Sequence, residues 1–162
     1  MNDLAINAAV ANDADRLARL IGEAFADVAI RFGLTRENCP GHTSFITADE
    51  VRRGMGFGNR YFMAILDGTV CGAVAIRLPK DGASIIEKVA VSPPFRHHGI
   101  GRRLMEHAFV EAKRCGAAAA EIGIIAKQTD LRAWYESFGF QATRQVQYEH
   151  LPFEVLLLRK GF

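Results

Sequence analysis

Basic residues surround two glycines near the middle of the chain, where residues 96–103 read Arg-His-His-Gly-Ile-Gly-Arg-Arg. The segment follows a β-branched stretch that ends at Val91 and opens an amphipathic stretch. The first N–H groups of a helix have no partners inside the helix and carry partial positive charge. Glycines let such a backbone approach a bulky anion. The sequence therefore predicts a pyrophosphate-binding loop made by Arg96, His97, His98, Gly99, Ile100, Gly101 and Arg102.

The glycine spacing separates this loop from two common phosphate-binding motifs. A P-loop ends in Gly-Lys-Ser or Gly-Lys-Thr, and neither tripeptide occurs in the chain. A dinucleotide-binding fingerprint needs a third glycine at position 104, which is Leu104 here. The remaining pattern is Arg-x-x-Gly-x-Gly, formed by Arg96, Gly99 and Gly101. Taken alone, this pattern also fits a glycine-rich turn that simply opens an amphipathic helix.

A carboxylate stands shortly before the loop, because Glu87 lies within the β-branched stretch from residue 85 to residue 91. Side chains two residues apart in a strand point to the same face, so Glu87 is expected beside Ile85, Val89 and Val91. Burial among apolar residues would raise the pKa of the carboxyl and suit it to take a proton through water. The alternative is an ordinary strand glutamate that pairs with a cation or reaches solvent.

Hydrophobic spacing predicts the elements that position these residues. One helix is expected to follow an N-cap at Asn12 or Asp13, and a second to follow an N-cap at Thr47. Two more are expected from about Gly99 to Gly116 and over residues 130–138. The Asp67-Gly68 pair is typical of a hairpin turn, and a further turn is expected at residues 79–82. Strands are predicted at residues 4–10, 61–66, 69–77, 85–91, 119–126, 143–149 and 153–159.

This order of elements predicts one α/β domain over residues 1–162, with a mixed, mostly antiparallel central sheet flanked by helices. The formal net charge of +2 gives no reason to expect nucleic acid or membrane as a partner. The three cysteines lack the spacing of a metal site or a disulfide framework. The first residues lack the basic and apolar regions of a signal peptide, so a cytoplasmic protein is expected.

The stretch from Ile86 to Pro93, followed by Arg96, Gly99 and Gly101, resembles the acetyl-CoA motif of the GNAT superfamily of N-acetyltransferases. The resemblance extends over roughly residues 61 to 162. It implies the GNAT-like acyl-CoA N-acyltransferase fold, acetyl-CoA as a co-substrate and no metal. It also implies that the strand residues Val89, Ala90 and Val91 bind the pantetheine arm and supply an oxyanion N–H, because this strand splays from its neighbour at residues 120–125.

A second segment resembles the family's Asn-x-x-Ala-x-x-Leu-Tyr-x-x-x-Gly-Phe signature. Tyr135 and the Gly139-Phe140 pair match it, whereas Gln128 replaces the asparagine; the alanine and first leucine positions are also changed. Glutamine keeps an amide, so the resemblance implies that Gln128 contacts the cofactor. It also implies that Tyr135 is the general acid for the leaving thiolate and leaves Glu87 as the candidate base for the amine. The alternative for Tyr135 is a half-buried aromatic in an apolar helix.

The resemblance implies an acceptor pocket among the N-terminal helices and the last strands, for the amine of a small molecule or a peptide. Aromatic, arginine and histidine residues there fit a small aromatic or anionic amine, and equally fit core packing. The chain could also be a non-catalytic acyl-CoA-binding sensor or interaction module, and a homodimer is left open. The residues concerned are Phe25, Arg31, Phe32, Arg36, His42, Phe45, Tyr148, His150 and Phe153.

Overall fold

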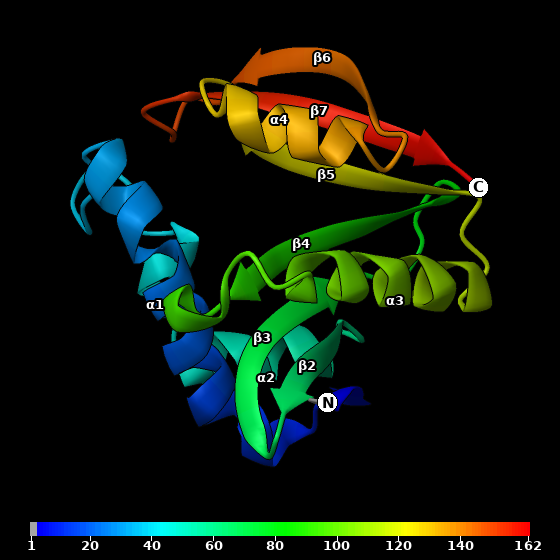
Figure 1. Ribbon diagram of the computed structural model, residues 1–162. Helices are drawn as coiled ribbons and strands as arrows, with labels where there is room; N and C mark the ends of the chain where they lie inside the picture. Colours follow the sequence, from blue (N-terminus) through cyan, green and yellow to red (C-terminus); the bar gives the residue numbers. More distant parts are fainter. Residues whose placement is uncertain (1–2) are drawn as a thin grey trace.

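A computed structural model describes residues 3–162, which form seven strands in one sheet of order β1-β2-β3-β4-β5-β7-β6 (Figure 1). Every neighbouring pair is antiparallel except β4 and β5, so the predicted mixed, mostly antiparallel sheet is confirmed. The sequence did not predict that the last strand inserts between β5 and β6. The strands are β1 (Leu4–Ala8), β2 (Arg60–Leu66), β3 (Thr69–Ile76), β4 (Ala83–Val91), β5 (Ala119–Ile125), β6 (Gln141–Gln147) and β7 (Glu154–Gly161).

Two tight turns produce the antiparallel run from β2 to β4. Asp67 and Gly68 both have positive φ, 49° and 81°, which is the conformation of a type I′ hairpin turn. Asp81 and Gly82 repeat the arrangement with φ of 53° and 85° before β4. Both predicted turns are therefore confirmed.

Helices cover both faces of the sheet. The helices α1 (Ala14–Arg31) and α2 (Ala48–Gly56) lie on one face, and α3 (Ile100–Arg114) and α4 (Thr129–Glu136) lie on the other (Figure 1). Short 3₁₀ turns, η1 (Ala11–Asp13), η2 (Thr43–Phe45) and η3 (Pro93–Phe95), connect them. None of the helices in residues 3–162 is long and apolar enough to cross a membrane.

Both predicted helix caps lie at helix starts, but they act differently. The Thr47 hydroxyl accepts the N–H of Glu50 at 3.2 Å, as a helix cap should. The Asp13 carboxylate instead accepts the N–H of Val10 at 2.8 Å, behind the helix, and pairs with Arg16. The reason is the short 3₁₀ turn η1 before α1, which holds Asp13 in a helical conformation and turns its side chain away from the free N–H groups of α1.

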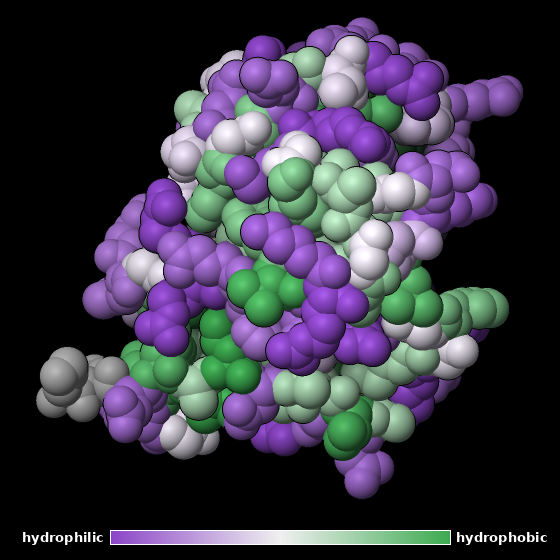
Figure 2. Space-filling model, turned by 90° about the vertical axis from the view of Figure 1, so that its right-hand side faces the viewer, coloured by the Kyte–Doolittle hydropathy of each residue, from purple (hydrophilic) through white to green (hydrophobic). Residues whose placement is uncertain are grey.

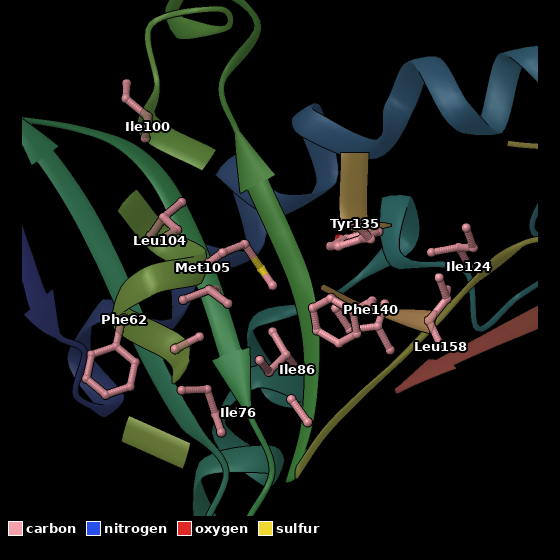
Figure 3. Packing of buried hydrophobic residues seen from close by; sticks show 14 of the residues in the cluster. Phe62, Ile76, Ile86, Ile100, Leu104, Met105, Ile124, Tyr135, Phe140 and Leu158 are labelled. Atoms are coloured by element: carbon pink, nitrogen blue, oxygen red, sulfur yellow. The ribbon is translucent and has the colours of Figure 1, made fainter. Parts of the chain in front are cut away.

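The two largest apolar cores lie back to back on the sheet. The larger joins α3 and α4 to the strands, and Figure 3 shows Leu104 and Met105 of α3 on one side and Tyr135 with Phe140 on the other. The smaller packs α1 and α2 over the opposite face of β2 to β4. On the face drawn in Figure 2, hydrophobic side chains are interspersed with hydrophilic ones. The cores therefore hold α1 on one side of β4 and α3 on the other, beside the one parallel strand pair found in residues 3–162.

The parallel pairing of β4 with β5 is short. Its ladder consists of Ala83↔Ala119, Ser84↔Ala120 and Ile85↔Glu121, and beyond this point the strands diverge (Figure 1). The predicted splay between these strands is thus confirmed. The edge of β4 that faces β5 beyond Ile85 presents N–H and C=O groups without a strand partner.

We predict that Phe140→Ala lowers the free energy of unfolding by about 3–5 kcal/mol, the usual cost of emptying a phenylalanine site in a core. Phe140 is 2% exposed and its ring centroid lies 5.8 Å from that of Tyr135. Denaturant unfolding measures the change. The matched control is Phe57→Ala, because Phe57 is 78% exposed and its removal should cost under about 0.5 kcal/mol. Equal effects of the two substitutions would contradict this account of the core.

Candidate functional site

A cleft of about 880 Å³ opens where β4 and β5 separate. Its walls are the diverging strands, the 95–102 loop with the start of α3, the residues Gln128 to Tyr135 at and after the start of α4, and parts of α1 and β7. The cleft brings together residues predicted for the site from distant parts of the sequence. Those that line it are Glu87, Val89, Ala90, Val91, Arg96, His97, Gly99, Ile100, Gly101, Arg102, Gln128 and Tyr135.

His98 is the one predicted site residue that does not line the cleft. Its Nδ1 lies 3.2 Å from the carbonyl oxygen of Phe95, and its side chain is exposed. Among the residues weighed for an acceptor pocket, Phe25, His42 and Phe153 line the cleft, and the others do not.

The loop before α3 presents a run of free N–H groups. Within residues 3–162, no carbonyl oxygen accepts from the N–H groups of residues 97–102, whereas Arg103 donates to Gly99 at 3.2 Å. His97 and Gly99 have positive φ of 65° and 78°, which turns the backbone sharply ahead of the helix. The arrangement is that of a helix start with an anion-binding concavity.

The glycines of the loop are required for different reasons. Gly99 has open space where a Cβ would stand, but its positive φ disfavours other residues. At Gly101 a Cβ would lie 3.3 Å from the indole of Trp134 on α4. Gly101 therefore lets α3 approach α4 closely. The floor of the cleft at this point is formed by Trp134, which was not among the site residues expected from the sequence.

The Arg96 guanidinium is engaged inside the protein. It pairs with Asp27 of α1 at 2.8 Å and donates to the carbonyl oxygens of Ala24 at 2.7 Å and Val91 at 3.3 Å. Burial raises the pKa of Asp27, but the hydrogen bond and charge of Arg96 outweigh it and hold that pKa below its usual value. Arg96 thus fastens the loop to α1 and β4. The backbone N–H groups and Arg102 remain to face an anion; the Arg102 guanidinium stacks on Phe138, 4.5 Å from the ring centroid, and pairs with no carboxylate within residues 3–162.

Tyr135 lies at the inner end of the cleft and is 5% exposed. Its ring packs against Trp134 and Phe140, with centroids 5.0 and 5.8 Å away. Burial raises the pKa of the Tyr135 hydroxyl above its ordinary value, because the phenolate would be desolvated. The hydroxyl is therefore protonated over the whole working range of pH, as a proton donor must be.

Glu87 shares a face of β4 with only one of the three residues that the sequence placed beside it. Glu87 stands opposite Ala75 and Ala90 stands opposite Ala73, with a register shift between these pairs. Lys88, with φ of 55°, is the bulged residue that breaks the alternation. Glu87 consequently shares a face with Ile85 and Ala90, beneath α1. The expected neighbour Ile85 is confirmed, and the expectation that Glu87 also lies beside Val89 and Val91 was wrong.

The expected rise in the pKa of Glu87 was also wrong. Burial does raise it, but Lys88 at 2.7 Å and Arg77 at 2.9 Å outweigh burial and hold the pKa of the carboxyl below its usual value. Glu87 is thus paired with two cations, as in the alternative described for it, and its carboxyl is ionised at neutral pH. The sequence analysis missed Arg77 and Lys88, although a lysine next to the strand glutamate was a visible signal.

Three comparisons with known proteins agree with this geometry. The sequence model of a family described as "Acetyltransferase (GNAT) domain" matches residues 57–142. The [ribosomal protein bS18]-alanine N-acetyltransferase of Escherichia coli is 31% identical over 94 residues, which cover 56% of this chain and 63% of that protein. The chain therefore matches less than two thirds of the length of this relative.

Solved structures share the fold. The ribosomal-protein-S18-alanine N-acetyltransferase from Escherichia coli superposes with a TM-score of 0.77 at 17% identity, over 99% of this chain and 94% of that one. The PaiA N-acetyltransferase from Thermoplasma acidophilum, in complex with coenzyme A, has a TM-score of 0.75 at 14% identity, over 99% of each chain. The family match covers more than half of the chain and includes the loop, the bulged strand and Tyr135. The chain therefore belongs to the GNAT family of acetyltransferases.

Proposed function

We propose that the chain is an N-acetyltransferase that moves the acetyl group of acetyl-CoA directly to the amine of a small molecule or peptide. The split between β4 and β5 is the observation that carries the proposal. It creates one cleft, which is lined by the loop with its free N–H groups, by the unpaired edge of β4 and by the buried Tyr135. A cytoplasmic location remains a prediction.

The cleft suits the shape and charge of acetyl-CoA. The N–H groups of residues 97–102 and the Arg102 guanidinium would bind the pyrophosphate. The free edge of β4 at Val89 to Val91 would pair with the amide groups of the pantetheine arm as an added strand does. Gln128, just before α4, offers its amide to the same arm.

In the proposed reaction the free amine attacks the thioester carbonyl, a C–N bond forms, and the C–S bond then breaks. A backbone N–H of β4 near the Lys88 bulge would stabilise the oxyanion. Tyr135 would give its proton to the departing thiolate, which suits a hydroxyl that burial keeps protonated. Glu87 would receive the proton of the amine through water; it is ionised at neutral pH because its cationic neighbours lower its pKa.

We predict that Gly101→Val weakens CoA binding about tenfold or more, because the new side chain meets Trp134 and displaces the helix start from the phosphates. Calorimetric titration with CoA measures it. Gly99→Val should act similarly through its positive φ. Gly56→Val is the control, since a Cβ at Gly56 meets nothing within 4 Å. Unchanged affinity in both loop variants would eliminate the proposed phosphate site.

We predict that Tyr135→Phe lowers kcat by about a hundredfold or more, the usual scale for losing a general acid, with CoA affinity unchanged. Release of free thiol from acetyl-CoA in the presence of an amine panel gives the rate. Tyr148→Phe removes a hydroxyl that does not line the cleft and should leave kcat unaltered. Normal turnover in Tyr135→Phe, with chemistry shown to limit the rate, would remove Tyr135 from the mechanism. Thiol release without any amine-dependent component would favour a binding module instead.

We predict that the defect of Glu87→Gln shrinks as pH rises. Since the pKa of Glu87 is lowered, the wild-type carboxylate is ionised and able to accept a proton throughout the neutral range. At higher pH the acceptor amine deprotonates in solution and the need for a base disappears. The ratio of wild-type to variant kcat/KM against pH tests this. A ratio independent of pH would show that Glu87 acts by holding Arg77 and Lys88 in place.

A further inference from the structure

We propose that the acceptor carries a carboxylate close to its amine, and that Arg77, Lys88 and His42 bind this carboxylate on the side of the cleft covered by α1 and η2. The inference rests on the proposed acetyl transfer and deepens it, because it names the chemical class of the acceptor.

Arg77 and Lys88 meet at Glu87, and His42 lines the same cleft. Glu87 stands opposite Ala75, on the face on which α1 packs, and Arg77 follows directly after β3. Phe25 of α1 and His42, the cap of η2, line the same cleft. The N–H groups of the 97–102 loop instead open α3, which packs on the other face of the sheet. The acceptor and the nucleotide part of acetyl-CoA would therefore reach the reaction centre from different parts of the cleft.

The cluster of Arg77, Lys88 and Glu87 is positive, and Asp27 of α1, which also lines the cleft, is paired with Arg96. Glu87 uses one carboxylate oxygen for Arg77, at 2.9 Å, and the other for Lys88, at 2.7 Å. Two cations on one carboxylate leave a net charge of +1 (+2 − 1). Burial and the charge of Glu87 raise the pKa of the neighbouring Tyr61 to about 12, so that hydroxyl stays neutral. Glu50 of α2 also acts on Tyr61, but it does not line the cleft.

His42 adds a neutral donor. Its Nδ1 lies 2.7 Å from the Ser44 hydroxyl oxygen and 3.2 Å from the Ser44 backbone nitrogen. An Nδ1 that accepts this backbone N–H carries no proton, which assigns the proton of the neutral ring to Nε2. Burial lowers the pKa of His42, which favours this neutral form. The ring of Phe25 packs edge-on against it, with centroids 6.3 Å apart. Arg77, Lys88 and His42 thus all offer N–H groups, and the one carboxylate among them already has both oxygens engaged.

A site of this kind selects its acceptor. Two cations disfavour the ammonium form of a bound amine, which assists deprotonation but weakens the binding of an amine that has no other charge. A carboxylate on the acceptor offsets that repulsion through charge-assisted hydrogen bonds. A polyamine carries at least two ammonium groups, and the cations of the site would repel each of them. Phe25 and Phe153 provide apolar surface for the rest of such an acceptor.

The test is calorimetry on the full chain saturated with CoA, at one pH near 7.5, with matched probes. Glycine, L-leucine, L-phenylalanine and L-glutamate are compared with their α-amides, which also imitate the amino terminus of a peptide. We expect the best acid to bind about tenfold or more tightly than its amide. Arg77→Gln and Lys88→Gln should each reduce that preference to about threefold or less. Arg144→Gln removes an exposed charge on β6, which does not line the cleft, and should leave the preference intact.

Turnover of acetyl-CoA with the same probes separates this inference from the proposed function. Equal or tighter binding of the amides, no binding of any acid, or a preference that survives both variants would overturn the carboxylate site. Acetylation of the amides would then leave the proposed function standing. A preference that both variants abolish, without acetylation of any probe, would keep the carboxylate site and count against the proposed function.

Discussion

The end of the parallel ladder at Ile85↔Glu121 is the constraint on which the site depends. Backbone N–H and C=O groups inside a protein need partners, so a sheet opens only where ligand or water can supply them. The two cores keep it open, because α3 and α4 fill one face of the sheet and α1 fills the other. The proposed acetyl transfer therefore takes place beside one strand edge that lacks a strand partner.

Local sequence predicted most of the fold, and some of the site, because local rules determine those parts. The Asp67-Gly68 turn and the glycines at 99 and 101 require particular backbone conformations, which a sequence displays directly. The environment of Glu87 could not be predicted from such local rules. A single bulged residue, Lys88, reverses the alternation of a strand, and the position of a bulge depends on pairing with β3. The insertion of β7 beside β5 likewise depends on contacts between distant residues.

Arg96 shows how a motif residue can serve a site without facing its ligand. Its guanidinium binds Asp27 and the carbonyl oxygens of Ala24 and Val91, so one side chain joins α1, β4 and the loop. The arginine in Arg-x-x-Gly-x-Gly therefore has a structural explanation in this chain, and the free N–H groups explain the glycines. The two parts of the motif do separate work, one holding the loop and the other facing the cleft.

The packing of Trp134 has a practical consequence. Trp134 is the single tryptophan of the sequence, and it lies between Gly101 and Tyr135 at the floor of the cleft. Indole emission depends on the polarity and contacts around the ring, so the intrinsic fluorescence of the unlabelled protein originates at the site itself. Occupancy of the cleft can thus be followed optically in the native chain, without a dye and without an added reporter residue.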